Sequence, residues 1–203
     1  MRGRPPSIRE EDILDAARDV LRKEGLAATT AKIAEEAGVS EGILFYRYKS
    51  KEALLAAVIH RETQPSESLR SIAKKAGQGS VQQNLETIIE TILDTVSRAH
   101  FFMELAETSP SSSEVRRILF SRSRRPPPQE MVELVANYLE QEETLGRLRK
   151  VNGLAVGRAV FGGCVDFIRS REFRTAGDSR AAFVQGLLDV ILNGAARPSQ
   201  PVG

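Results

Sequence analysis

The sequence predicts an all-α protein, and three observations support this fold class. Apolar residues recur at intervals of three and four positions, as they do on the buried face of a helix. Glycines, prolines and serine-rich stretches are clustered between these runs rather than spread through them. No stretch shows the apolar-polar alternation of a half-buried strand. We therefore expect helices from end to end and no sheet.

Helix starts and stops can be placed from capping residues. Ser7 and Glu10 fit a capping box at the start of the first helix, and Gly25 stops that helix. Ser40 and Ser50 are suited to cap the third and fourth helices. Together with the apolar periodicity, these signals predict helices at about residues 7–24, 30–37, 40–48, 50–59, 81–96, 101–105, 115–125, 131–139, 153–171 and 179–193.

Composition excludes several classes of protein. The chain of 203 residues is 41% hydrophobic and 28% charged, which is typical of a folded globular protein. A single cysteine excludes an intrachain disulfide, and the two histidines, His60 and His100, form no metal-ligand motif. We expect no cofactor, no metal and no enzymatic activity, because no catalytic triad or phosphate-binding glycine loop is present either.

The apolar stretches argue against a membrane location. The most apolar long stretch, residues 151–168, is interrupted by Arg158 and Asp166, so a membrane span is not expected. The first six residues, Met-Arg-Gly-Arg-Pro-Pro, are not followed by the apolar core of a secretory signal. The expected location is therefore the cytoplasm.

Residues 29–48 have the spacing of a helix-turn-helix motif. Ala34 is small where the two helices touch, and Gly38 can take the left-handed conformation that ends the first of them. Ser40 caps the second helix, which Leu44 holds against the core. Such a geometry presents the N-terminal half of the second helix to the major groove of DNA. The alternative is a helical hairpin that makes no DNA contact.

This stretch, continued by Lys49-Ser50-Lys51-Glu52-Ala53-Leu54-Leu55, resembles the DNA-binding region of the tetracycline-repressor (TetR/AcrR) family. The resemblance covers about a quarter of the chain. It implies a DNA-binding domain with a basic arm at residues 1–50, an effector-binding and dimerisation domain at residues 51–195, and a flexible tail at residues 196–203. It further implies a homodimeric repressor that binds a palindromic operator in double-stranded DNA and is released by a small molecule.

The same resemblance implies the DNA contacts. Thr30 would hold a phosphate, and Lys51 would grip the DNA backbone. Four residues at the start of the recognition helix would face bases: Ser40, Glu41, Gly42 and Ile43. Phe45 and Tyr46 would pack on sugar, methyl or phosphate groups, and Arg47 could add a charged contact. The family usually shows Tyr at the position of Phe45 and Tyr or His at the position of Arg47. Phe45 therefore lacks a hydroxyl that could bond a DNA phosphate, while Arg47 adds a positive charge.

The N-terminal arm carries a second DNA signal. Arg2-Gly3-Arg4-Pro5 has the form of a minor-groove hook, in which two guanidinium groups enter the narrow groove of A·T-rich DNA. The alternative is a disordered basic terminus.

The last two predicted helices are apolar on nearly every side, which indicates a dimer. Glycines at 153, 157, 162 and 163 permit close approach of backbones, and the final helix carries a wide apolar stripe that includes Leu188 and Ile191. Pairing with the same helices of a second copy would form a four-helix bundle. The alternative is that both helices complete the core of a single chain.

Large, soft or aromatic residues on the middle helices are candidates for an effector pocket. They are Phe101, Phe102, Met103, Met131, Tyr138, Phe161, Cys164 and Phe167, with His100, Glu104 and Asp166 as possible polar anchors. Each of them also suits a core position. The arginine-rich stretch at 116–125 suits either a solvated face or an anionic ligand. The rival functions are a regulator of this family that answers to a protein partner, a helical enzyme, and an adaptor without DNA binding.

Overall fold

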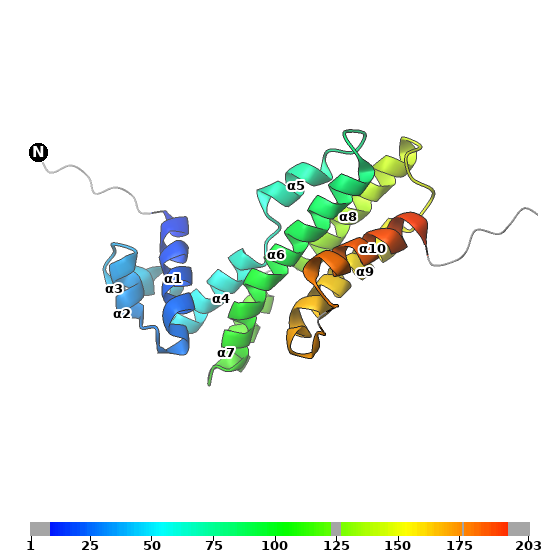
Figure 1. Cartoon of the computed structure of the whole chain (residues 1–203). Coiled ribbons are helices and arrows are strands. Elements are labelled where there is room, and N and C mark those ends of the chain that lie inside the picture. The colour runs from blue at the N-terminus through cyan, green and yellow to red at the C-terminus, as the bar shows by residue number, and fades with distance from the viewer. Residues whose placement is uncertain (1–8, 123–126, 176, 195–203) are drawn as a thin grey trace, which may run out of the picture. The chain divides into compact units, whose positions relative to one another are not determined.

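The computed structural model describes residues 9–122, 127–175 and 177–194, and every regular element in these ranges is helical (Figure 1). The all-α prediction is confirmed. Within these ranges no helix combines the length and the apolarity needed to cross a membrane. The elements are α1 Glu10–Glu24, η1 Gly25–Ala27, α2 Thr30–Glu36, α3 Glu41–Tyr48, α4 Lys51–Glu62, α5 Glu67–Ala73, α6 Val81–Glu107, α7 Ser112–Arg122, α8 Pro127–Thr144, α9 Gly153–Arg169, η2 Arg171–Phe173 and α10 Arg180–Asn193.

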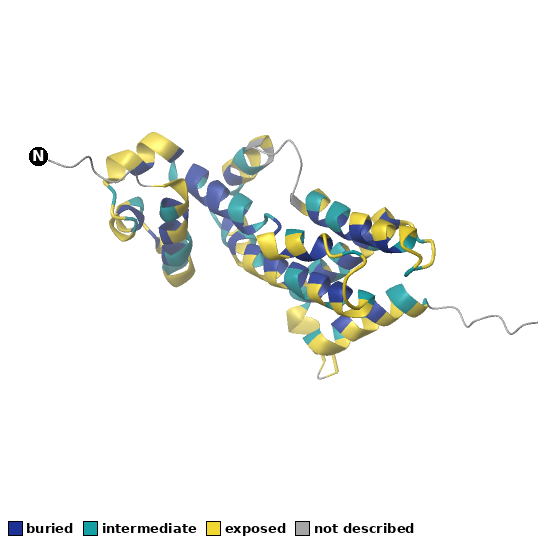
Figure 2. Ribbon diagram, turned by 90° about the horizontal axis from the view of Figure 1, so that it is seen from above, coloured by how far each residue is buried: buried dark blue, intermediate teal, exposed yellow. Residues whose placement is uncertain are grey.

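The described residues form two compact units, each with its own apolar core. The first unit contains residues 9–64 and 98–122, and the second contains residues 65–97, 127–175 and 177–194. Figure 2 shows buried and exposed residues alternating along the helices of each unit, as amphipathic helices require. These units are defined by packing, whereas the predicted boundaries at residues 50 and 195 divide the chain by function, and those boundaries stay a prediction.

In the first unit, α1 to α4 pack with α7 and the end of α6 around fully buried aliphatic side chains, among them Ile13, Ile33 and Leu44. Each such side chain contributes about 1.5–3 kcal/mol through burial. The Arg61 guanidinium on α4 donates hydrogen bonds to the backbone oxygens of Glu11 at 3.3 Å and Leu14 at 3.1 Å. It therefore fixes α4 to the N-terminal half of α1.

In the second unit, α8 and α9 approach each other through glycine. A Cβ added to Gly157 would lie 2.5 Å from the backbone oxygen of Val132, and one added to Gly153 would lie 3.0 Å from that of Ala136. The predicted close backbone approach is confirmed at these two positions. At Gly162 an added Cβ would meet nothing within 4 Å in the single chain, so close approach to a second copy there stays a prediction.

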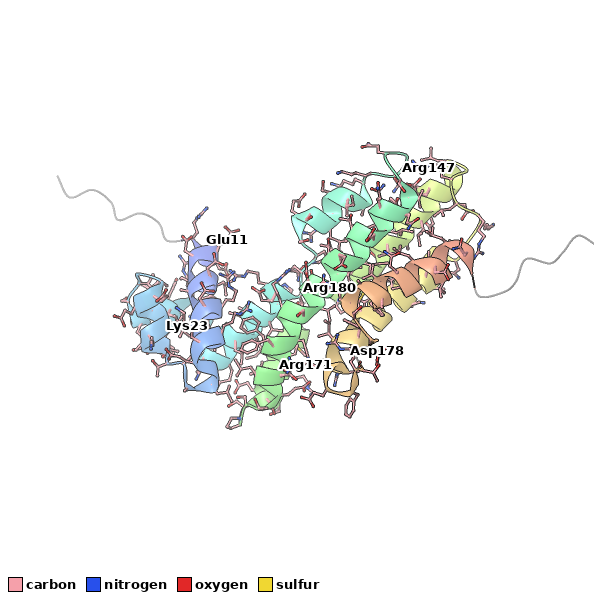
Figure 3. The ribbon with its side chains drawn as sticks, in the orientation of Figure 1. Glu11, Lys23, Arg147, Arg171, Asp178 and Arg180 are labelled. Atoms are coloured by element: carbon pink, nitrogen blue, oxygen red, sulfur yellow. The ribbon has the colours of Figure 1, made fainter. Side chains whose placement is uncertain are left out.

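Charged side chains hold the outer helices of the second unit. Arg180 at the start of α10, labelled in Figure 3, pairs with Glu90 on α6 and lies 2.8 Å from an Asp94 carboxylate oxygen. On α8 the carboxylate of Glu142 is completely buried; it accepts a hydrogen bond from the backbone N–H of Gly77 at 3.3 Å and lies 3.3 Å from Arg147 Nε. These contacts fix α10 to α6 and the loop before α6 to α8.

Two predicted starts of helices need correction. The first helix begins at Glu10 rather than at residue 7: the carboxylate of Asp12 accepts a hydrogen bond from the backbone N–H of Arg9 at 3.1 Å, so Arg9 is the N-cap. Ser7 lies outside the described residues. Helix α8 begins at Pro127 rather than at residue 131. Proline is tolerated there because the N–H groups of the first turn have no acceptor within the helix.

Other differences concern helix number and length. Residues 81–96 and 101–105, expected as two helices, belong to the single helix α6, because no glycine or proline interrupts the hydrogen-bond ladder between them. The short helix α5 was not predicted, since its seven residues carry too few apolar positions to show a period. The basic helix α7 begins at Ser112 rather than at residue 115, and residues 123–125 of its expected end lie outside the described residues.

Candidate DNA-binding surface

The turn between α2 and α3 is fixed by backbone hydrogen bonds. Gly38 has a φ of +64° and donates its N–H to the oxygen of Glu35 at 3.0 Å, while the N–H of Val39 reaches the oxygen of Ala34 at 2.9 Å. This pair of bonds is a Schellman motif, which favours glycine at the left-handed position. Ser40 then accepts a hydrogen bond from the N–H of Ile43 at 3.3 Å and starts α3. The predicted turn chemistry is confirmed.

The helix α3 buries one side and exposes the other. Leu44 and Tyr48 are buried, and the Tyr48 hydroxyl lies 3.4 Å from a Glu10 carboxylate oxygen. On the opposite side the exposed fractions of Ile43 and Phe45 are both 42%, and that of Tyr46 is 79%. Large apolar surface costs free energy in water. Three such exposed side chains on one short helix therefore indicate that the helix contacts a partner.

Two predicted contact residues contact each other. The hydroxyl of Thr30, at the start of α2, donates a hydrogen bond to the Glu41 carboxylate at the start of α3. Nearby on α2, Lys32 forms an ion pair with Glu24 of α1, and this carboxylate holds the pKa of the lysine above its ordinary value. Because Lys32 pairs with Glu24, the carboxylate at the start of the recognition helix, that of Glu41, is bonded to Thr30 and not to this lysine.

Basic side chains follow at the C-terminal end of α3. Lys49 has a φ of +66°, donates from Nζ to the Tyr46 backbone oxygen at 2.6 Å, and places this ammonium 4.8 Å from the centre of the Tyr46 ring. Lys51 Nζ donates to the Leu26 oxygen at 2.7 Å, which leaves two of its three N–H donors for another acceptor. A phosphate backbone requires such donors.

The remaining predicted DNA contacts are exposed or lie outside the described residues. Ser40, Gly42 and Arg47 are exposed on the same module. Arg2 and Arg4 lie outside the described residues, so the arm stays a prediction. The positive charge of Lys49 is visible in the sequence, but the left-handed backbone that turns its side chain onto Tyr46 is not.

The predicted effector residues fall into two separate groups. Phe101, Phe102 and Met103 belong to the first unit, where Phe102 is fully buried. The other five belong to the second unit. Phe161 is half-buried, and the remaining four are buried: Met131, Tyr138, Cys164 and Phe167. The eight residues are therefore divided between the two units.

Two clefts include a predicted effector residue. In the first unit, a cleft of about 230 Å³ lies between α4, α6 and α7, and it is lined by Ile59, Met103, Ala106, Glu107, Ser112, Val115, Arg116 and Leu119. In the second unit, Phe167 lines a hollow of about 390 Å³ near η2, together with Phe173, Arg174 and Phe183. The Arg174 guanidinium already covers the Phe167 ring at 4.1 Å.

Comparison with known families and curated proteins points to bacterial regulators. Residues 13–58 match the model of the "bacterial regulatory proteins, tetR family". The HTH-type transcriptional regulator BetI of Escherichia coli is 33% identical over 90 residues, which are 43% of this chain and 46% of that protein. The chain thus spans about half the length of the curated relatives it matches.

Solved structures share the fold over nearly the whole chain. A TetR-family regulator from Mesorhizobium loti superposes with a TM-score of 0.65 at 18% identity and covers 89% of this chain and 95% of its own. Thermus thermophilus FadR, a TetR-family repressor solved in complex with lauroyl-CoA, superposes with a TM-score of 0.58 at 23% identity and covers 96% of this chain and 99% of its own. At these identities the likeness is one of fold.

Proposed function

We propose a repressor function from one premise: this chain belongs to the tetR family of bacterial helix-turn-helix transcriptional regulators. In this proposal the protein binds a palindromic operator as a homodimer and dissociates from it when a small molecule binds. Its role is regulation rather than catalysis.

One observation carries the DNA-binding part of this proposal. The helix α3 exposes Ile43, Phe45 and Tyr46, while Lys49 caps its C-terminal end and Lys51 begins α4. Apolar side chains suit the methyl and sugar groups of a groove, and ammonium groups suit the phosphates beside it.

Selection of bound duplexes from a random pool tests this part. We expect enrichment of one inverted repeat whose half-sites lie about 34–36 Å apart, or a multiple of that. Binding should weaken steeply with added salt, since phosphate contacts release counterions. Equal binding of all sequences, or no binding in dilute salt, would refute the proposal.

The proposed dimer uses the outer faces of α9 and α10. Val190 is 56% exposed in the single chain, and Leu154 is exposed as well. Small exposed residues lie beside them on the same two helices: Ala155, Ala159 and Gly162 on α9, and Ala182 and Gly186 on α10. Leu188, which was expected to belong to this face, is 2% exposed and instead packs in the core of its own unit.

For the effector we propose an amphipathic anion of the acyl-CoA kind, bound to the cleft of the first unit. The cleft has an apolar floor that includes Met103 and Leu119, and Arg116 lies at its edge. A second hollow of about 450 Å³ shares Ser112 and Arg116 with it and adds Arg117. An acyl chain would fill the first hollow, and phosphates would meet the arginines of the second. The lauroyl-CoA held by the Thermus thermophilus regulator has this chemistry.

Release of selected operator DNA tests the effector. Lauroyl-CoA should release the DNA, whereas free coenzyme A and laurate each lack half of the recognised groups and should act only at much higher concentration. Arg116→Gln should raise the half-releasing concentration of lauroyl-CoA about tenfold or more, as expected for the loss of one charge-assisted contact. Lys150→Gln removes an equal charge from an exposed position in the other unit and is the control. Equal responses of the two variants would refute the site.

A further inference from the structure

We infer that Glu41 selects cytosine in each half-site of the operator, and that Thr30 acts as the positioning residue for its carboxylate. This inference rests on the proposed function, because it requires α3 to lie in a major groove. It goes beyond that function by naming a base and by giving Thr30 a role other than phosphate binding.

The geometry places one fixed carboxylate at the leading end of the recognition helix. Glu41 is the first residue of α3 and is exposed. Its Oε1 accepts the hydrogen bond from the Thr30 hydroxyl on α2, so the long side chain is held in one orientation. A carboxylate has about four acceptor sites, so one bond leaves Oε2 free to accept from a base. Pre-organisation of this kind lowers the entropy lost on binding.

The chemistry of the major groove decides which base such a group accepts. A carboxylate near DNA is repelled by phosphates, so it is tolerated only where the groove offers a donor. Cytosine offers its N4 amino group, whereas guanine and thymine present acceptors at their base edges. Adenine offers N6, but its neighbouring N7 is an acceptor that repels a carboxylate. Cytosine is therefore the preferred base and adenine the second.

The hydrogen bond also decides the role of Thr30. A threonine hydroxyl carries a single proton to donate. While that proton is donated to Glu41, it is not available to a phosphate oxygen. Thr30 therefore acts on the base through Glu41. The backbone N–H of Lys32, which donates to Thr29 Oγ1 at 3.2 Å, shows that the residue before Thr30 performs the capping of α2. Loss of the Thr30 hydroxyl should therefore leave α2 intact.

The experiment compares base preferences in operators selected from random duplexes. For the unchanged chain we expect one position per half-site to be cytosine, with at least tenfold weaker binding when thymine replaces it. Glu41→Gln should move the preference at that position to adenine, because an amide can bond both N6 and N7 of adenine. Glu36→Gln removes an equal charge from an exposed position on α2 and should keep the cytosine preference.

Thr30 variants separate positioning from phosphate binding. Thr30→Val should reduce the cytosine-to-thymine discrimination about threefold or more while pooled DNA binds nearly as before, and Thr30→Ser, which keeps the hydroxyl, should restore it. Equal weakening on all sequences by Thr30→Val would mean a phosphate contact and overturn the positioning role. An unchanged base preference in Glu41→Gln would overturn the selection of cytosine by Glu41. If the unchanged chain enriches no sequence, the proposed function itself fails, which is a distinct result.

Discussion

Two surfaces of this chain expose apolar side chains, and they differ in what surrounds them. On α3, Ile43 and Tyr46 lie among a carboxylate, hydroxyls and lysines. On α9 and α10, the exposed residues near Leu154 and Val190 in the sequence include alanines and glycines as well as Arg158 and Asp189. The apolar content alone does not distinguish the two.

The surroundings indicate the partner. DNA presents phosphates every few ångströms, so a surface that approaches it needs cations and hydrogen-bond donors. A second helix pair presents only side chains, so close approach needs small residues and few charges. Exposed hydrophobicity thus predicts that a partner exists, whereas the polar and small neighbours predict its chemistry.

The largest expected effect concerns the α9–α10 surface. Val190→Glu should weaken the homodimer by about 3–5 kcal/mol, because each copy would place an unpaired carboxylate in a desolvated seam. Leu145→Glu is the matched control: Leu145 is 55% exposed, nearly the same as Val190, but lies outside α9 and α10. Sedimentation over a concentration series measures both dimers. An unaltered dimer in Val190→Glu would place the interface elsewhere.

The second prediction concerns the buried side of α3. Leu44→Ala should lower the free energy of unfolding by about 2–5 kcal/mol, as for other fully buried leucines. Urea denaturation measures this change, and DNA binding should weaken only as a consequence. If Leu44→Ala unfolds at the same urea concentration as the unchanged chain, Leu44 does not contribute to the core.

The contrast between the two surfaces also marks what the sequence can predict. The turn at Gly38, the cap at Ser40, the burial of Leu44 and the exposure of Tyr46 were all predicted, because each follows from contacts within a few residues. Local rules of capping and periodicity are sufficient for such features.

The features that were missed depend on residues far apart in the chain. Leu188 is part of the same apolar stripe as its neighbours, and only packing shows that it is core. Lys51 was expected to face DNA, yet its Nζ also satisfies a backbone oxygen 25 positions earlier, at Leu26. The predicted effector residues share size and softness, but they are divided between two units. No local pattern encodes these partners.

The third prediction concerns the exposed side of α3. Tyr46→Ala should weaken operator binding by about 1–3 kcal/mol and change the free energy of unfolding by less than about 0.5 kcal/mol. Phe173→Ala is the control, since Phe173 is an exposed aromatic residue outside the DNA-binding module. Operator titration and thermal melting of both variants measure the difference. A lower melting temperature with intact DNA binding in Tyr46→Ala would mean that the assigned facing of α3 is wrong.

The smallest expected effect concerns Cys164, a buried residue of the second unit that contributes to neither surface. Burial raises the pKa of its thiol from the ordinary 9.0 to about 12, so the unfolded chain releases this proton first as the pH rises. Stability should therefore be lost from about pH 9 upward, on the order of 1 kcal/mol at pH 9.5, relative to Cys164→Ala. Urea denaturation of the two chains at pH 7 and pH 9.5 measures the difference. A thiol reagent at pH 8 should modify Cys164 only after denaturant is added, and rapid modification of the folded chain would show that the thiol is accessible.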